Sequence, residues 1–351
     1  MKIKHIYWFA AYNLNGPSAR YRGYFPLEYM RKNENIQYDF VYPERTVKGV
    51  YKFVKVYLTA LLFRKKNSII VVQKICSNGL YANMLKLLVV LRTNNTQYDL
   101  DDAEYLRQDT KTLHYFLRKC SIISVGSDAL KKYCNKFNKN VFMLTSPVIY
   151  HENIKQTKNK ILNIGWVGDF GNGNKISQEF SHKKSMYEIL FPVLKSINKP
   201  LSLTLIGIKN QKDIPEIHKY FQDADQISIN ILKDLDWEND KDWVYEEISK
   251  FDIGISPMTN HLYNRSKSAF KSKQYLSVGV PAIASDVGEN SKYVLNGING
   301  ILFNYSEELK KAIERFIEMS DIEYALFSKN ALKYRNDYSI KKYYETIAEH
   351  Y

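Results

Sequence analysis

The segment richest in chemical groups runs from Lys267 to Gly288 (KSAFKSKQYLSVGVPAIASDVG). Its pattern predicts a helix over 268–278 whose N-terminal turn carries Lys267 and Lys271, followed by a Gly-x-Pro turn and a short buried strand. A helix N-terminus offers unpaired N–H groups and positive dipole charge to an anion, and two ammonium groups one turn apart strengthen that field. The segment therefore predicts a diphosphate site. A solvated basic face is the alternative, because lysine is common throughout the chain.

A second group of charged side chains, Asp99, Asp101 and Asp102, closes the strand predicted over 96–100. The spacing Asp99-Leu-Asp101 would suit Mg²⁺ or Mn²⁺. We do not assign a metal here, because lysines and helix N-termini elsewhere in the chain already provide a phosphate site that needs none. One of these aspartates could instead cap the helix that follows.

The loop after the first strand holds a third group (NGPSARYR, 15–22). Gly16 allows the backbone to approach a ligand closely, and Ser18 is the expected N-cap. Arg20 and Arg22 fall in the first helical turn, where the dipole disfavours cations, so an external anion is one explanation. Ordinary surface arginines are the other.

Strands and helices alternate along the whole chain, which predicts parallel sheets with right-handed crossovers. The polar stretch 151–160 interrupts this alternation and is the expected linker. We therefore predict an α/β protein with two Rossmann-like doubly wound domains, 1–150 and 151–335, facing a cleft, with ligands at the carboxyl ends of the strands. A C-terminal helix over about 336–351 is expected to cross back to the first domain. The expected strands are 3–11, 38–42, 68–72, 96–100, 122–125, 141–144, 161–167, 201–206, 227–232, 253–256, 282–285 and 300–303. The expected helices are 20–32, 47–66, 80–91, 128–137, 184–197, 244–251 and 268–278.

Composition excludes several classes of protein. The 351 residues are 45% apolar and 25% charged, which argues against disorder. Three cysteines at unrelated spacings form neither a disulfide framework nor a zinc site. The longest apolar stretches, 54–63 and 85–91, are shorter than the roughly 20 residues of a spanning helix. We expect a cytoplasmic protein without a signal peptide. Its net charge of +14 favours an anionic partner, but no nucleic-acid motif is present.

The helix predicted over 47–66 sets Lys48, Lys52 and Lys55 opposite an apolar stripe and closes with Arg-Lys-Lys. The predicted stripe consists of Val50, Phe53, Val54, Tyr57, Leu58 and Leu61. It could rest on an anionic bilayer at the inner face of the membrane as a peripheral contact. We favour the alternative, in which the helix packs on the sheet of the first domain with its lysines in water.

Taken in order, these segments resemble the family 4 nucleotide-sugar glycosyltransferases of the GT-B fold, in the form found in bacterial surface-polysaccharide and capsule synthesis. The segment 267–288 matches the family's C-terminal signature, and 251–257 (FDIGISP) and 296–303 (NGINGILF) flank it as in that family. The segment 169–184 falls where the family binds phosphate, and 124–130 falls where its last N-domain strand ends.

At some positions the chain has other residues than the family pattern. The family's Glu-x7-Glu pair falls on Ser266 and Gln274, and a Gln amide can still contact the ribose hydroxyls. A subset of similar bacterial sequences carries Lys-x3-Lys, which Lys267 and Lys271 match. The family's Gly-Arg reads Gly168-Asp169 here, which leaves Lys183 or Lys184 as the phosphate-binding lysine.

The resemblance implies a retaining glycosyltransferase that moves a sugar from a nucleotide-diphosphate sugar to a glycan or lipid-linked acceptor, with neither metal nor cofactor. Retention implies that no dedicated general base is needed. A non-catalytic protein that binds a nucleotide sugar or glycan on the same fold is the alternative, because both family glutamates are missing. The implied residues are Lys267, Lys271, Asp101 and Asp102 for catalysis, Gly16, Gly168, Asp169, Lys183, Lys184, Ser266 and Gln274 for the donor, and Arg20, Arg22 and Asp99 for the acceptor.

Overall fold

The computed structural model describes residues 3–62, 67–92, 94–107, 109–171, 178–232 and 243–351. The chain divides into two compact units. Unit 1 comprises Met1–Pro147, Ser266–Ser268 and Tyr338–Tyr351; unit 2 comprises Val148–Arg265 and Ala269–Asp337. The polar stretch 151–160 therefore lies inside unit 2. The tripeptide Ser266–Ser268 joins unit 1, which nothing in the sequence pattern indicates.

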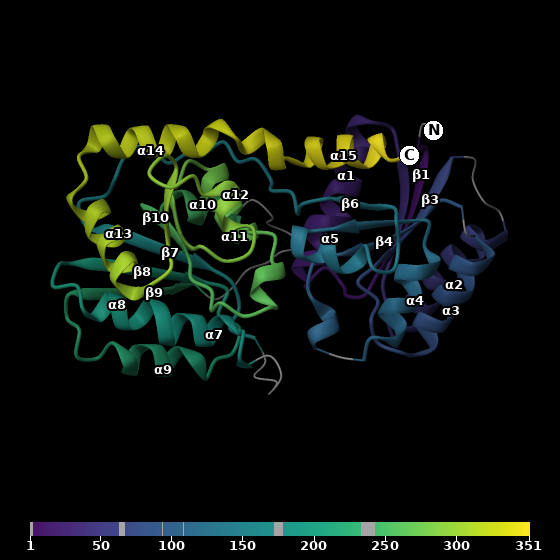
Figure 1. Cartoon of the computed structure of the whole chain (residues 1–351), viewed down its shortest axis with the longest axis horizontal. Helices are drawn as coiled ribbons and strands as arrows, with labels where there is room; N and C mark the ends of the chain where they lie inside the picture. Colours follow the sequence, from purple (N-terminus) through teal and green to yellow (C-terminus); the bar gives the residue numbers. More distant parts are fainter. Residues whose placement is uncertain (1–2, 63–66, 93, 108, 172–177, 233–242) are drawn as a thin grey trace. The chain divides into compact units, whose positions relative to one another are not determined.

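Unit 1 is built on a six-stranded parallel sheet in the order β2-β1-β3-β4-β5-β6 (Figure 1). Its strands are β1 (His5–Ala10), β2 (Gln37–Val41), β3 (Ser68–Gln73), β4 (Thr96–Leu100), β5 (Ile122–Val125) and β6 (Val141–Met143). Its helices are η1 (Ala19–Tyr24), α1 (Phe25–Asn33), α2 (Val47–Leu62), α3 (Leu80–Leu91), η2 (Glu104–Leu106), α4 (Lys111–Lys119), α5 (Asp128–Cys134) and α15 (Ile340–Glu349).

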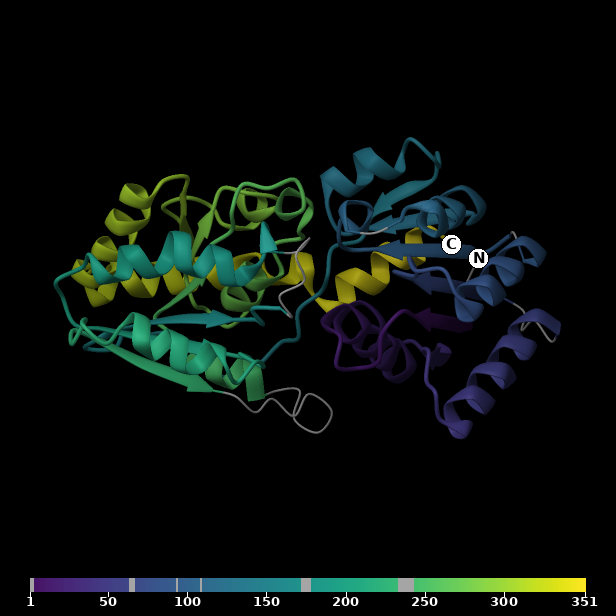
Figure 2. The ribbon, with the colours of Figure 1, turned by 90° about the horizontal axis from the view of Figure 1, so that it is seen from below.

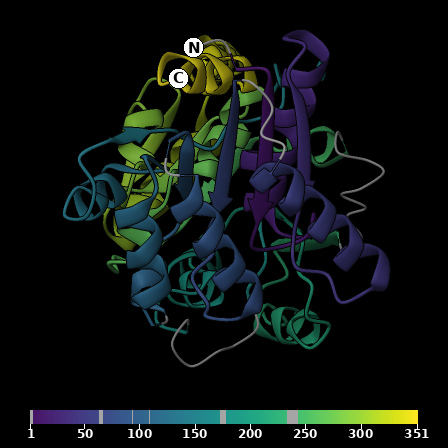
Figure 3. The same ribbon diagram turned by 90° about the vertical axis from the view of Figure 1, so that its right-hand side faces the viewer.

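Alternate residues of β1 face opposite helical layers of unit 1. Ile6 and Trp8 belong to a buried cluster that includes Leu27 of α1 and Tyr343 of α15, and Figure 2 shows the yellow α15 beside the purple α1. Phe9 points the other way, and its ring centroid lies 6.2 Å from that of Phe53 on α2. Figure 3 shows α2, α3 and α4 side by side on that face. The side chains of β1 thus alternate between two layers of helices, and these layers cover both faces of the sheet, as in other doubly wound domains.

Unit 2 repeats the arrangement with a parallel sheet in the order β12-β11-β10-β7-β8-β9. Its strands are β7 (Leu162–Val167), β8 (Leu201–Ile206), β9 (Ile227–Leu232), β10 (Ile253–Ser256), β11 (Ala282–Ser285) and β12 (Gly300–Phe303). Helices α8, α9 and α13 share one buried cluster with the sheet. The helices are α7 (His182–Ser185), η3 (Met186–Leu190), α8 (Phe191–Lys195), α9 (Asp213–Tyr220), α10 (Trp243–Ser249), η4 (Asn264–Ser266, whose last residue belongs to unit 1), α11 (Phe270–Ser277), α12 (Asn290–Tyr293), α13 (Ser306–Glu318), α14 (Asp321–Lys333) and η5 (Arg335–Tyr338, whose last residue also belongs to unit 1).

The predicted fold class is confirmed, and most strands begin and end within a residue or two of their predicted bounds. The helices differ more. The one predicted over 20–32 is a π-helical segment followed by α1, and the one predicted over 184–197 is divided among α7, η3 and α8. The end of the helix predicted over 47–66 lies outside the described residues. Within the described ranges, no helix has the length and apolar character needed to cross a membrane.

A glycine on β10 allows α11 to lie close to the sheet. A Cβ at Gly254 would stand 2.1 Å from the ring of Tyr275, a residue of α11. The Tyr275 hydroxyl accepts a hydrogen bond from the amide of Val167 on β7 and donates one to the carbonyl oxygen of Ile255 on β10. The glycine and the tyrosine therefore fix α11 against two strands at once.

We expect Gly254→Ala to destabilise the protein by about 1–3 kcal/mol, because the added methyl group must displace a fully buried ring. Gly79→Ala is the matched control, since a Cβ there meets no atom within 4 Å. Urea denaturation of both variants measures the effect. Equal stability of the two would show that α11 moves away from the sheet without penalty.

Candidate functional site

Four side-chain and backbone features of unit 2 meet where β7 ends. The Lys271 Nζ lies 2.9 Å from Nε2 of His182, the first residue of α7, and 5.7 Å from the ring centroid of Trp166. A Cβ at Gly168 would stand only 2.9 Å from Lys271 Cε, so the absence of a side chain at 168 makes room for the lysine. Trp166 is buried, and its Nε1 has no hydrogen-bond partner. An ammonium group, an imidazole and an unused N–H donor therefore lie near one strand end, a chemistry suited to an anion.

The N-terminus of α11 adds backbone donors to this strand end. The residue before it, Ala269, has a left-handed conformation (φ 54°), and no side chain caps the helix. The first intrahelical bond runs from Lys273 N to Ala269 O, so the positive end of the helix dipole lies here. An anion at this terminus would meet that dipole and the Lys271 ammonium together.

The two lysines of the signature do not share a helix turn. Because α11 begins at Phe270, Lys267 precedes the helix, and it belongs to unit 1 whereas Lys271 belongs to unit 2. The prediction of one N-terminal turn carrying both is therefore wrong. The left-handed residue Ala269 separates them, and helical periodicity in the sequence gives no sign of it.

The other residues predicted to bind the donor have varied surroundings. Lys183 Nζ pairs with Asp213 at 2.8 Å and with a neighbouring glutamate of α9. Lys184 Nζ pairs with Glu179 at 2.6 Å. Gln274 is buried in α11. The half-buried Asp169 follows Gly168, but residues 172–177 of the predicted phosphate loop lie outside the described residues.

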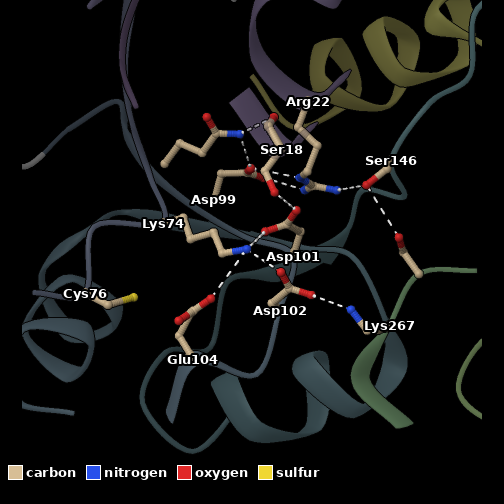
Figure 4. Close-up of polar contacts among 12 residues, drawn as sticks. Ser18, Arg22, Lys74, Cys76, Asp99, Asp101, Asp102, Glu104, Ser146 and Lys267 are labelled. Carbon is tan, nitrogen blue, oxygen red and sulfur yellow. Dashed lines mark hydrogen bonds and ion pairs between the residues drawn. The ribbon is translucent and has the colours of Figure 1, made fainter. Parts of the chain in front are cut away.

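In unit 1, Lys74, the residue directly after β3, forms ion pairs with three carboxylates. Figure 4 shows the Lys74 ammonium between them: its Nζ lies 3.1 Å from Asp101 and 3.4 Å from Glu104, and it also pairs with Asp102. Lys74 has a left-handed backbone (φ 55°), which directs the residue away from the path of the strand. Among the described residues, no group of His, Cys, Asp and Glu side chains is arranged to hold a metal. The ammonium takes the position between carboxylates where a cation would otherwise bind.

Two lysines determine the charge of Asp102. Burial would raise its pKa, but Lys74 and Lys267 outweigh burial and hold the pKa of this carboxyl group well below its usual value. The Lys267 Nζ lies 3.7 Å from Asp102 Oδ1. Asp102 is therefore ionised at neutral pH and is not fully covered, because its side chain keeps 21% of its exposure.

This arrangement predicts acid sensitivity in unit 1. A carboxyl whose folded pKa is lowered contributes stability above its unfolded pKa of about 4, and this contribution is lost as the pH falls through and below that value. We expect Asp102→Asn to be less stable than wild type at pH 7, and the difference to shrink at pH 3. Denaturant titrations at both pH values measure this, with the exposed Glu152→Gln as control. A difference that stays constant with pH would contradict the lowered pKa.

Two of the three residues predicted to bind the acceptor, Arg22 and Asp99, form a buried pair. Arg22 Nε lies 2.9 Å from Asp99 Oδ2, and Nη1 donates to the carbonyl oxygen of Leu144 at 2.6 Å. Both side chains of the pair are completely inaccessible. Asp99 also accepts from Ser124 Oγ at 2.6 Å. With their hydrogen-bonding groups engaged inside unit 1, Arg22 and Asp99 are positioned to support the sheet, and their contact with an acceptor stays a prediction.

The loop after β1 also differs from its prediction. The Ser18 hydroxyl donates to Asp101. Its oxygen accepts no hydrogen bond from a helix amide, so Ser18 does not cap the helix through its side chain. Arg20 is buried and donates to the carbonyl oxygen of Leu14 at 2.5 Å. Gly16 stays half-buried in the loop, where its carbonyl oxygen accepts from the amide of Arg20.

The tripeptide Ser266–Ser268 is held in unit 1 by three polar contacts. Ser127 Oγ donates to Ser266 O at 2.7 Å, Tyr105 Oη lies 3.5 Å from Ser266 Oγ, and Ser268 Oγ lies 3.5 Å from Ser146 Oγ. The Ser266 side chain is short and buried, which suits this position. The charge at 267 is thereby directed to Asp102.

Comparison with known proteins agrees with this architecture. Residues 163–319 match the family model described as Glycosyl transferases group 1. No curated protein sequence matches the chain. Across its full length the structure is similar to HepE of Anabaena in complex with UDP (TM-score 0.65, 14% identity, 98% of each chain). It is also similar to sucrose-phosphate synthase of Thermosynechococcus elongatus (TM-score 0.70, 12% identity, 99% and 98% of the two chains).

A third similar structure is the lipopolysaccharide outer core galactosyltransferase WaaB in its apo form, with a TM-score of 0.64, 10% identity and 99% of each chain covered. At these identities the structural likeness establishes the fold, which is GT-B. The residues that match the Glycosyl transferases group 1 model, 163–319, make up most of unit 2.

Sequence reasoning did not single out three residues of these clusters: Lys74, Glu104 and Trp166. Lys74 follows β3 directly, so the rule that ligands gather at carboxyl ends of parallel strands could have found it. Trp166 lies within β7 and resembles any core residue in the sequence. Burial raises the pKa of the Cys76 thiol, drawn in Figure 4, to about 12, which disfavours the thiolate form.

Proposed function

We propose that this protein is a glycosyltransferase that takes its sugar from a nucleotide-diphosphate sugar held by unit 2. The observation that carries the proposal is the strand end where Lys271, His182 and the N-terminus of α11 meet, inside a segment that matches the Glycosyl transferases group 1 model. The leaving nucleotide diphosphate gains negative charge as the sugar bond breaks. An ammonium group and oriented amides stabilise charge that develops at that position.

The remaining details of the reaction follow from the family resemblance. The transfer retains anomeric configuration, and the sugar is a hexose or a related unit. Metal is not required, because Lys271 and backbone amides neutralise the diphosphate. HepE has been solved with UDP and with UDP-glucose, which makes uridine the first base to test here.

The acceptor is a glycan or a lipid-linked glycan, and the pathway is the synthesis of bacterial cell-surface polysaccharide such as capsule. On unit 1, Asp101 and Asp102 are the groups that would orient an acceptor hydroxyl. Asp102 supports this role best, since it is ionised and keeps part of its surface exposed. WaaB, a lipopolysaccharide galactosyltransferase, has the same fold.

A thermal-shift screen against UDP-, GDP-, dTDP- and CMP-sugars tests donor binding, because a ligand that binds only the folded state raises Tm. The stabilising donor is then incubated with the protein and candidate glycans, and released nucleotide diphosphate is measured. A raised Tm with release of nucleotide diphosphate supports the proposal. A raised Tm without release in any reaction, including donor hydrolysis, would favour the non-catalytic alternative that Ser266 and Gln274 motivate.

A further inference from the structure

Helix α2 is apolar on two sides, and only one of them packs on the sheet. The inward side buries Phe53, Val56 and Tyr57. The outward side carries six exposed apolar side chains, whose exposed fractions run from 38% to 89%. Their spacing of three or four residues forms one continuous stripe along the helix. They are Val47, Val50, Tyr51, Val54, Leu58 and Leu62.

The neighbouring helix extends this exposed apolar surface. On α3, four apolar side chains are likewise exposed, and α3 lies beside α2 in Figure 3. We call these ten residues of α2 and α3 the outer face. Soluble proteins expose single apolar residues routinely, but a gathering of this kind marks an interaction surface. The α3 members are Leu80, Leu87, Val90 and Leu91.

Positive charge runs along the apolar stripe. Lys48, Lys52 and Lys55 are all exposed and follow one another at spacings of four and three residues. Each stands next in sequence to a stripe residue, and α2 contains no acidic residue. A lysine can lay its methylene chain along an apolar surface while its ammonium group reaches a polar layer beyond.

We propose that the outer face binds the surface of an anionic lipid bilayer. The stripe would enter the boundary between head groups and acyl chains, and the three lysines would contact phosphate groups. Packing of α2 on the sheet does not compete with this role, because it uses the opposite side of the helix. A second copy of this chain is the poorer occupant, since two-fold pairing through the same face would set the lysine row against its own copy.

Vesicle flotation tests the proposal. We expect the protein to float with vesicles containing about 30 mol% phosphatidylglycerol at low salt and to remain in solution with phosphatidylcholine alone. The triple variant Lys48→Gln/Lys52→Gln/Lys55→Gln should partition about 100-fold less, because each lysine near such a surface contributes a factor of about five. Val54→Ser/Leu58→Ser should also reduce binding, and added salt should not rescue it.

Matched controls come from unit 2. Lys311→Gln/Lys329→Gln/Lys333→Gln removes the same charge from exposed sites on α13 and α14. Ile322→Ser/Leu326→Ser removes exposed apolar side chains from α14. Both controls should bind vesicles as wild type does. Equal loss in these controls, no binding by wild type at low salt, or concentration-dependent dimers abolished by the stripe variant would each overturn the proposal.

The result is independent of the proposed enzymatic activity. Every outer-face variant should keep the donor-induced rise in Tm, because that ligand binds unit 2. A protein that floats but binds no donor would refute the transferase and leave the bilayer contact standing.

Discussion

Replacing Lys271 with alanine is expected to lower kcat/KM for sugar transfer by about 10²–10³-fold, the cost of removing one donor that stabilises developing charge. The Lys271 ammonium lies at the end of β7 beside His182 and over Trp166, where the leaving diphosphate is proposed to bind. Most of the loss should appear in kcat, because the diphosphate carries more charge in the transition state than in the bound donor.

The assay measures released nucleotide diphosphate, and Lys219→Ala on α9 is the control, since it removes an exposed lysine from the same unit. Lys271→Arg should retain part of the rate, because it keeps the charge while changing the geometry. Full activity in Lys271→Ala, at unchanged protein stability, would remove the phosphate site from this strand end.

The fold of this protein follows closely from its sequence because short apolar runs bounded by turn residues define buried strands. Leu201–Ile206 and Ile253–Ser256 are examples in which the predicted and observed bounds agree. The described residues contain twelve such strands alternating with helices, which leaves few arrangements other than two doubly wound sheets.

The site is harder to predict because its side chains are placed by contacts far apart in the sequence. Asp99 and Arg22 are 77 positions apart, and only tertiary structure shows that they neutralise each other. Lys267 lies four positions before Lys271 but belongs to the other unit, owing to a left-handed backbone at Ala269. Composition and helical period contain neither fact.

The buried side of helix α2 is hard to predict from the sequence for a different reason. Its sequence is apolar at so many positions that helical periodicity alone could not select the buried side. Val50, Val54 and Leu58 belong to the predicted stripe yet are exposed, whereas Phe53 and Tyr57 are buried. Phe53 packs with its ring centroid 6.2 Å from that of Phe9 on β1, and the other side of the helix stays in contact with solvent.

The Arg22–Asp99 pair should control the stability of unit 1. Asp99→Ala is expected to reduce the free energy of unfolding by about 3–5 kcal/mol, because it leaves the buried guanidinium without its counter-charge. In a double-mutant cycle with leucine at both positions, the variant Arg22→Leu/Asp99→Leu should lose less free energy of unfolding than Arg22→Leu and Asp99→Leu lose together. The double variant buries no unpaired charge. Urea denaturation followed by circular dichroism gives all the values of this double-mutant cycle.

The exposed pair Arg315–Glu323, with a 2.9 Å contact and side chains 49% and 43% exposed, supplies the control cycle. Solvent screening limits such a pair to less than about 1 kcal/mol. A similarly small coupling between Arg22 and Asp99 would mean that water reaches the pair and that these groups are available to a ligand after all. A large coupling keeps Arg22 and Asp99 inside unit 1 and favours Asp102, with its lowered pKa and partly exposed carboxylate, as the proposed contact of an acceptor hydroxyl.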